Sequence, residues 1–217
     1  FLRDETCCRS IYQAQTMISV YQLKPRFQAL LQPVLRQLRN WGFTPNSLTI
    51  IAFLLSLAMG CYSYYGERHI ALILVPACLL LRMALNALDG MMARQFNLQS
   101  KLGAVLNEMG DLLSDAVLYF PVLYVLFYMD PIWVGWFIFL SILNEFAGLL
   151  GQALGGERRY DGPMGKSDRA LVIGLLCLLS SFGLSLQVYF TWIFLSIFTL
   201  LIMSTYKRLK NATLSHE

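Results

Sequence analysis

Long apolar segments separated by mostly short polar connections run through the sequence. Six of them approach the roughly 20 mostly apolar residues that a helix needs to cross a bilayer. They are 47–66, 70–93, 103–128, 132–154, 168–185 and 187–206. No internal repeat is visible, so the pattern predicts one all-α domain, a polytopic membrane protein with six transmembrane helices. The composition agrees, because 57% of the 217 residues are hydrophobic and only 14% are charged, which is too apolar for a soluble domain.

The residues before the first span divide into two parts. Residues 1–16 are polar and without pattern, and we interpret them as a tail of uncertain origin, since Met17 would make a natural start. Residues 17–43 place apolar side chains at helical spacing among basic ones, which is typical of an interfacial amphipathic helix broken near Pro25 and Pro33. A cytosolic cap helix is the alternative. The six-helix domain then covers 44–210, and 211–217 form a C-terminal tail.

The positive charges indicate an orientation in the membrane. All but two of the 17 lysines and arginines flank the same ends of the predicted spans, the exceptions being Arg68 on the other side and Arg82 inside the second span. Such residues accumulate on the cytoplasmic side, so we expect both termini there. The net charge of +4 reflects this topology and would attract anionic membrane lipid; it gives no reason to expect a nucleic acid as partner.

The second and third spans each carry a polar face near their cytoplasmic ends. At 100° per residue, the polar residues of the second span fall, with Ala93, within a wedge of roughly 60°; they are Arg82, Asn86 and Asp89. In the third span Glu108, Asp111 and Asp115 fall within about 60°, and Asn107 lies at the edge of that wedge. Charged residues within spans usually face a bundle interior or a water-filled cavity.

The short connection makes these two helices antiparallel neighbours, so the two faces should meet. A rise of about 1.5 Å per residue puts Asp89 and Asn107 roughly 8 Å below the cytoplasmic surface and Asp111 roughly 14 Å below it. Carboxylate and amide oxygens are the ligands of hard cations such as Mg²⁺; an interhelical polar clasp is the alternative. Arg82 and Asp115 both lie roughly 18–20 Å deep, and we expect them to form a buried salt bridge.

The fixed positions read Asn86-x₂-Asp89-Gly90-x₂-Ala93-Arg94-x₈-Gly103-x₃-Asn107-x₃-Asp111. This spacing resembles the signature of the CDP-alcohol phosphotransferase family, also called CDP-alcohol phosphatidyltransferases, in which Asp stands at the positions of Asn86 and Asn107. The stretch "TPNSLT" (44–49) is similar to the Pro-Asn-x-Leu-Thr entry common in the family. The likeness covers about residues 20–210 and is nearest a bacterial inner-membrane subgroup that carries "NALDG".

The resemblance implies an enzyme of phospholipid biosynthesis that moves a substituted phosphate from a CDP-linked donor, commonly CDP-diacylglycerol, to a polar alcohol and releases CMP. The family's four acidic positions hold one or two divalent cations, Mg²⁺ or Mn²⁺; here they are Asn86, Asp89, Asn107 and Asp111. Asp111 matches the general base. The nucleotide-binding positions match Asp89, Gly90, Ala93, Arg94 and Gly103, with Asn46 and Thr49 as further candidates. Family members are often homodimers.

The two asparagines keep a ligand oxygen but lose the charge. Three outcomes stay open: another acid such as Glu108 or Asp115 restores the charge, the site holds one cation, or catalysis has been lost. Glu145, in the fourth span at the estimated depth of Asp111, either faces the cavity as a further acid or is paired between helices. On the same side of the membrane, Lys166 is the best candidate to contact the acceptor. Three arginines could contact either the acceptor or lipid headgroups, namely Arg158, Arg159 and Arg169.

Two other classes of function remain alternatives. One is a catalytically silent relative that binds CDP-lipid or acts as a scaffold, which the two asparagines motivate. The other is a cation-coupled transporter, which the absence of visible inverted repeats disfavours. The first expectation remains a phosphatidyltransferase of the bacterial inner membrane, with its active site on the cytoplasmic side.

Overall fold

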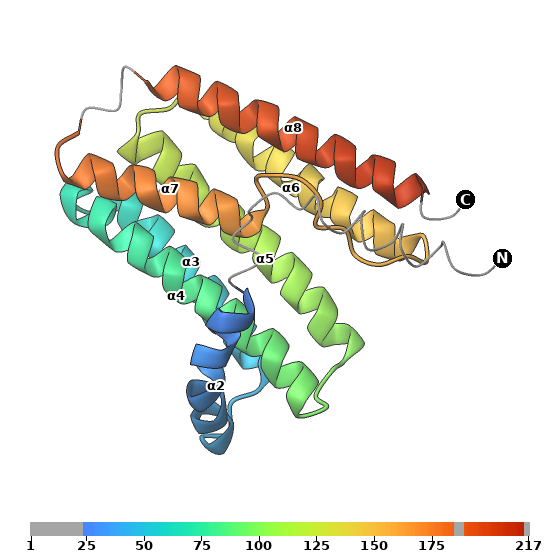
Figure 1. Ribbon diagram of the computed structural model, residues 1–217. Helices are drawn as coiled ribbons and strands as arrows, with labels where there is room; N and C mark the ends of the chain where they lie inside the picture. The colour runs from blue at the N-terminus through green and yellow to red at the C-terminus, as the bar shows by residue number, and fades with distance from the viewer. Residues whose placement is uncertain (1–23, 185–188, 215–217) are drawn as a thin grey trace.

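The computed structural model describes residues 24–184 and 189–214, and every regular element in these ranges is helical (Figure 1). In chain order the elements are α2 (Lys24–Asn40), α3 (Pro45–Tyr65), α4 (Arg68–Gln95), α5 (Lys101–Pro121), the π-helical turn η3 (Val122–Leu126), α6 (Pro131–Ala153), α7 (Lys166–Ser181) and α8 (Phe190–Leu214). The predicted all-α class is confirmed. The predicted tail 1–16 and residues 17–23 of the predicted interfacial helix lie outside the described residues.

Five helices are long and apolar enough to cross a membrane, namely α3, α4, α5 together with η3, α6 and α8. The helix at the fifth predicted span, α7, has only 16 residues. At 1.5 Å per residue it is about 24 Å long, less than the roughly 30 Å of the hydrocarbon core. In the described ranges the count of six spans is therefore not confirmed. The last helix also runs to Leu214, past the predicted domain boundary at 210.

Local sequence signals start α3 and α5, two of the helices around the motif. Thr44 caps α3: its Oγ1 accepts from the backbone N–H of Ser47 at 3.2 Å, and Ser47 Oγ accepts from the backbone N–H of Thr44 at 3.0 Å. Pro45 follows at the first helical position, where its missing N–H costs nothing. At the start of α5, Ser100 Oγ accepts from the N–H of Gly103 at 2.9 Å. These caps hold the first turns of α3 and α5 in place on the side of the bundle where the polar faces lie.

Both α4 and α5 pack most extensively against α3, while α7 lies along α4 and α6 pairs with α8 (Figure 1). Contacts between α5 and α6 join the two groups. The helices α3 and α5 approach closely at Gly60, where an added Cβ would lie 2.3 Å from the carbonyl oxygen of Val117. This crossing places the polar face of α5 within reach of side chains on α4 and α7.

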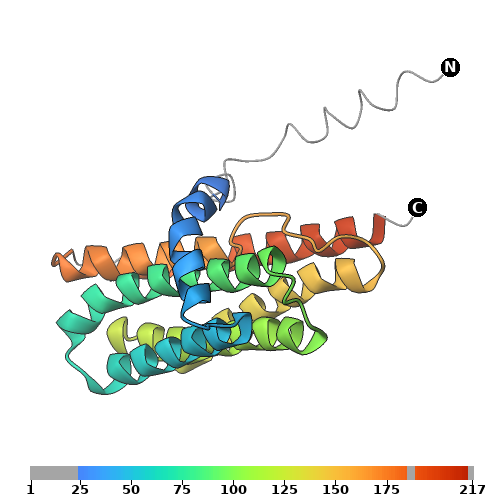
Figure 2. The same cartoon turned by 90° about the horizontal axis from the view of Figure 1, so that it is seen from below.

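The first described helix, α2, lies across the bundle at a steep angle to the other helices (Figure 2). Its Leu35 is fully buried and belongs to a small apolar core formed with Leu48, Leu88, Met91 and Met92. The expected break at Pro33 is wrong, because α2 continues through it as one helix. Proline removes a single backbone hydrogen bond, and the burial of Leu35 two residues later offsets that loss.

Candidate active site between α4, α5 and α7

The polar faces of α4 and α5 meet through side chains. Asn86 on α4 donates from Nδ2 to Asp111 Oδ1 on α5 at 2.7 Å. Asp89, one turn along α4, is buried and accepts from the Thr49 hydroxyl of α3 at 2.9 Å. The carboxylate of Asp89 also lies within electrostatic range of Asp111. The motif positions therefore gather in one place, as the spacing predicts.

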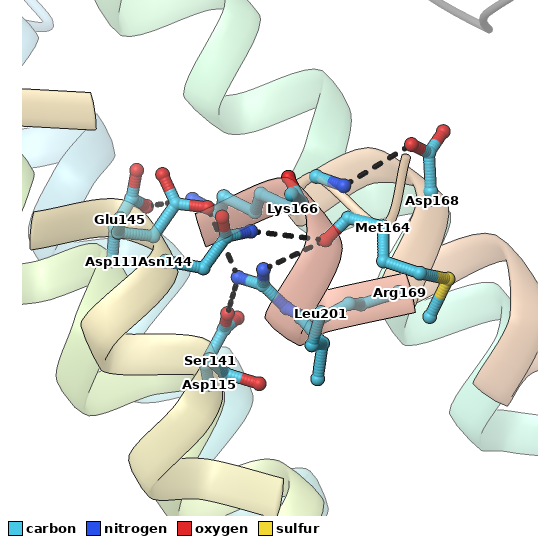
Figure 3. A network of polar contacts seen from close by, with 12 residues as sticks. Asp111, Asp115, Ser141, Asn144, Glu145, Met164, Lys166, Asp168, Arg169 and Leu201 are labelled. Atoms are coloured by element: carbon cyan, nitrogen blue, oxygen red, sulfur yellow. Dashed lines mark hydrogen bonds and ion pairs between the residues drawn. The ribbon is translucent and has the colours of Figure 1, made fainter. Parts of the chain in front are cut away.

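A cation from a third helix enters the same cluster. Lys166, the first residue of α7, forms an ion pair with Asp111 Oδ1, and Figure 3 shows the lysine beside that carboxylate. Its ammonium also acts electrostatically on Asp89. Lys166 thus contacts Asp111 directly and lies in the same cluster as Asp89.

The motif positions offer oxygen donors suited to Mg²⁺ or Mn²⁺. Asn107 Oδ1 is buried and has no hydrogen-bond partner among the described residues, so a bound cation would satisfy an oxygen that the protein leaves unpaired. Across the described ranges, no three His, Cys, Asp or Glu side chains gather as a metal-binding group. The reason is that amides stand at Asn86 and Asn107, which leaves Asp89 and Asp111 as the motif's carboxylates.

The small residues of the motif have different surroundings. A Cβ added at Gly103 would lie 2.9 Å from both Asn46 Oδ1 and Ser100 Oγ, so the start of α5 needs a glycine for its contact with α3. A Cβ added at Gly90 would meet only the Arg94 guanidinium, at 3.5 Å, which is ordinary van der Waals contact. Arg94 is exposed, and Ala93 is half-buried.

Behind the motif, a network of ion pairs crosses the interior of the bundle (Figure 3). The predicted pair is present: Arg82 Nη2 lies 2.6 Å from Asp115 Oδ1. Arg169 of α7 joins it, since its Nη2 lies 3.1 Å from Asp115 Oδ2 and 3.3 Å from Glu145 Oε1 of α6. Arg208 of α8 lies 3.8 Å from Glu145 Oε2. Ion pairs between almost fully buried side chains thus link five helices, namely α4, α5, α6, α7 and α8.

The network shows which partners Arg169 and Glu145 have, which the sequence left open. Arg169 has a side chain with 0% exposure, so in this structure it contacts carboxylates between helices and not the lipid headgroups expected as one option. Glu145 follows the second of its two options, pairing between helices. Arg208 was missed, because it lies in a basic segment that membrane topology already explains. Its guanidinium donates to the Asn144 carbonyl at 2.8 Å.

Glu108 and Arg158 form a further ion pair at the edge of the cluster. Arg158 also lies 3.5 Å from Glu145 Oε2. Burial lowers the pKa of the Arg158 guanidinium, but its neighbours Glu108, Tyr160 and Glu145 together raise that pKa above its ordinary value. The acids expected as replacements for the missing motif charge, Glu108, Asp115 and Glu145, are thus all already paired with arginines.

The loop before α7 packs onto α6 and α8. The backbone N–H of Arg159 donates to the Gly148 carbonyl at 3.1 Å, and a Cβ at Gly148 would lie 2.6 Å from the Arg159 carbonyl oxygen. Gly162 has a φ of +90°, and an added Cβ would meet Ser204 at 2.8 Å. These close approaches position the chain leading to Lys166, and Arg159 lies half-buried within them.

A cavity of about 420 Å³ lies at the opposite end of the bundle, between the loop 127–129 that follows η3, α6 and α8. Aromatic and aliphatic residues line it, including Phe127, Trp133 and Phe190. Trp133 precedes Glu145 on α6 by about 18 Å at 1.5 Å per residue, so the cavity is remote from the motif. It contributes no chemistry to the cluster around Asp111.

A family model described as CDP-alcohol phosphatidyltransferase matches residues 43–202. The match includes the whole motif and the start of α7 with Lys166. The chain belongs to the CDP-alcohol phosphatidyltransferase family. Its relatives include inner membrane protein YnbA of Escherichia coli (strain K12), 45% identical over 175 residues, which are 81% of this chain and 84% of that protein. The archaetidylinositol phosphate synthase of Pyrococcus horikoshii is 36% identical over 101 residues, 46% of this chain and 52% of that protein.

Solved structures of family members share the fold. The phosphatidylinositol phosphate synthase PgsA1 of Mycobacterium tuberculosis with CDP-DAG bound has a TM-score of 0.66 at 21% identity, covering 83% of this chain and 92% of that one. The complex of the same enzyme with manganese and citrate has a TM-score of 0.66 at 20% identity, covering 83% and 87%. At this level of identity the likeness concerns the arrangement of the helices.

Proposed function

We propose that this family member transfers a phosphatidyl group from CDP-diacylglycerol to a polar alcohol and releases CMP. The observation that carries the proposal is the gathering of Asp89, Asp111 and Lys166 from three helices into one cluster. The likeness to an enzyme crystallised with CDP-DAG supports this donor. The predominance of lysine and arginine at one end of the spans supports an active site at the cytoplasmic leaflet.

In the proposed reaction the acceptor hydroxyl oxygen attacks the phosphorus that carries the lipid. Asp111 takes the hydroxyl proton as general base, and the bond from that phosphorus to the bridging oxygen breaks as CMP leaves. Asp89, Asp111 and the Asn107 oxygen would hold Mg²⁺ or Mn²⁺, which supplies charge neutralisation at the diphosphate. Thr49 orients Asp89 through its 2.9 Å hydrogen bond.

The remaining motif residues bind the nucleotide in this proposal. Gly90 leaves room on α4 for the cytidine diphosphate, because an added Cβ there meets no packed protein atoms except the Arg94 guanidinium. Arg94 is exposed and offers a forked donor to phosphate. Asn46 lies against Gly103, which brings the starts of α3 and α5 together on the side where the nucleotide would lie.

We infer that the acceptor carries an anionic group, such as a phosphate. Lys166 is partly exposed beside Asp111, and Arg158 is partly exposed beside Glu108 at the edge of the cluster; both would attract an anion toward Asp111. The relationship to an archaetidylinositol phosphate synthase supports this class of acceptor. Arg159 is the third candidate for this contact.

Purified protein in detergent, supplied with CDP-diacylglycerol, Mn²⁺ and a panel of phosphorylated and neutral alcohols, should release CMP with a phosphorylated acceptor. A silent relative is the second candidate function, favoured by the amides at Asn86 and Asn107. Binding of the CDP-lipid without CMP release for any acceptor would support that candidate and contradict the proposed reaction.

Two glycine substitutions separate nucleotide binding from packing. Gly90→Ala should keep or raise stability, by about 0.5–1 kcal/mol for an added methyl in a helix, but weaken CDP-lipid binding. Gly103→Ala should lower stability by about 1–3 kcal/mol, because its Cβ would lie 2.9 Å from Asn46 and Ser100 oxygens. Thermal unfolding and CDP-lipid affinity, both measured in detergent, test this contrast. Wild-type affinity in Gly90→Ala would remove Gly90 from the nucleotide site.

A further inference from the structure

One carboxylate oxygen in the cluster has two nitrogen partners. Asp111 Oδ1 accepts from Asn86 Nδ2 at 2.7 Å and also forms the ion pair with Lys166 Nζ. An ionised carboxylate only accepts hydrogen bonds, so the NH₂ end of the Asn86 amide must face it. An aspartate at position 86 would instead bring a second negative charge to Asp111 and would need a cation between the two.

The neighbouring carboxylates are already neutralised by arginines, so they add little negative charge near Asp111. Glu108 is paired with Arg158, and Glu145 with arginines of α7 and α8. Asp115 lies between Arg82 and Arg169. In the described part of the cluster, the carboxylates left to neutralise a bound metal ion are Asp89 and Asp111, and Lys166 already offsets part of their charge.

We propose that the active site takes a single divalent cation, and that the Lys166 ammonium and the Asn86 amide act in place of a second one. This inference rests on the proposed function and specifies its metal requirement. With Lys166 present and before the donor diphosphate binds, one divalent cation would leave the two carboxylates and the ammonium with one net positive charge, whereas two would leave three. An unbalanced charge of that size inside the membrane is strongly disfavoured.

The assignment gives the two asparagines different roles. Asn86 uses its amide nitrogen toward Asp111 and so replaces a bridging metal by a hydrogen bond. Asn107 presents a buried oxygen without a protein partner, which completes the donor set of Asp89 and Asp111 for the one cation. The amides at both positions and the lysine at the start of α7 together make the site less negatively charged.

Titration of the purified full chain with Mn²⁺ in the absence of nucleotide, followed by electron paramagnetic resonance of the free ion, tests the stoichiometry. The wild type should bind one Mn²⁺ per chain. The triple variant Asn86→Asp/Asn107→Asp/Lys166→Gln should bind two, with the line broadening of two coupled Mn²⁺ ions. Because it needs no turnover, this readout does not depend on finding the acceptor.

The single variant Lys166→Gln tests the role of the ammonium directly. It should still bind one Mn²⁺, but roughly tenfold more tightly, because a like charge beside Asp111 has been removed. Lys101→Gln is the matched control, an exposed lysine at the start of α5, and should leave Mn²⁺ affinity unchanged.

Two Mn²⁺ ions bound to the wild type, together with CMP release, would overturn the single-cation inference and leave the proposed reaction standing. Unchanged or weaker Mn²⁺ binding in Lys166→Gln would overturn the role of the lysine. Absence of any Mn²⁺ binding to a wild type that still binds CDP-lipid would overturn both the inference and the proposed metal-dependent reaction.

Discussion

Asp111→Asn should lower CMP release by about 10³-fold or more, since it removes a general base and a metal-binding carboxylate in one step. The substitution keeps the side-chain shape and an oxygen that still accepts from Asn86, which lies 2.7 Å away. It deprives Lys166 of its ion pair, but that lysine is partly exposed, so the folding cost is small. Initial rates of CMP release with CDP-diacylglycerol and a phosphorylated alcohol provide the measurement.

The matched control is Glu157→Gln, the same carboxylate-to-amide change at an exposed position in the loop before α7. It should leave the rate within twofold of wild type, since it removes a negative charge only from an exposed loop side chain and leaves the motif carboxylates unchanged. Melting temperatures of both variants in detergent would show whether the fold survives. A folded Asp111→Asn variant that keeps more than a tenth of the wild-type rate would exclude Asp111 as the base.

The gathering of the motif was predictable because helical periodicity fixes which residues share a face. Spacing alone placed Asn86 and Asp89 on the side of α4 that meets Asp111, and it paired Arg82 with Asp115 at equal depth. Those inferences depend on the rise and rotation of a helix and on the short connection between the two spans. They hold even though α4 and α5 each pack mainly against α3, since their polar side chains span the remaining distance.

What lay beyond prediction was the choice among partners brought together from distant segments. Glu145 is 24 residues from Arg169 and 63 from Arg208 along the chain, and no local pattern indicates that the three meet. Positive-inside topology explained both arginines equally well as surface residues. The same holds for Lys166, whose place beside Asp111 depends on how the loop packs against Gly148 and Ser204.

The length of α7 and the expected break in α2 are two further predictions that differ from the structure. A hydropathy pattern does not register where a helix stops, so the 16-residue α7 read as a full span. Pro33 predicted a break in α2, yet packing of Leu35 into the small core outweighs one missing hydrogen bond. In α2 a tertiary contact decides the outcome, whereas the end of α7 is marked locally by Gly183, which has a φ of +81° and donates from its backbone N–H to the Ser180 carbonyl at 3.1 Å.

The second large effect is expected for the buried pair of α4 and α5. Arg82→Leu should destabilise the protein by about 3 kcal/mol, because it leaves the carboxylate of Asp115 in the interior with Arg169 as its remaining ion-pair partner. Asp115→Leu should cost a similar amount, since Arg82 would keep only the Asp111 carbonyl, 3.0 Å from its Nη2. The double variant Arg82→Leu/Asp115→Leu should lose at least about 1 kcal/mol less than the sum of the singles.

Unfolding free energies from denaturing-detergent titration of the four proteins give the coupling directly. Arg94→Leu, an exposed arginine on the same helix, is the control and should change stability by less than about 0.5 kcal/mol. Strictly additive losses would show that Arg82 and Asp115 are held independently, with Arg169 alone neutralising the carboxylate. A positive coupling energy would instead make the pair a unit that fixes the register of α4 against α5, and with it the distance between Asn86 and Asp111 on which the single-cation site depends.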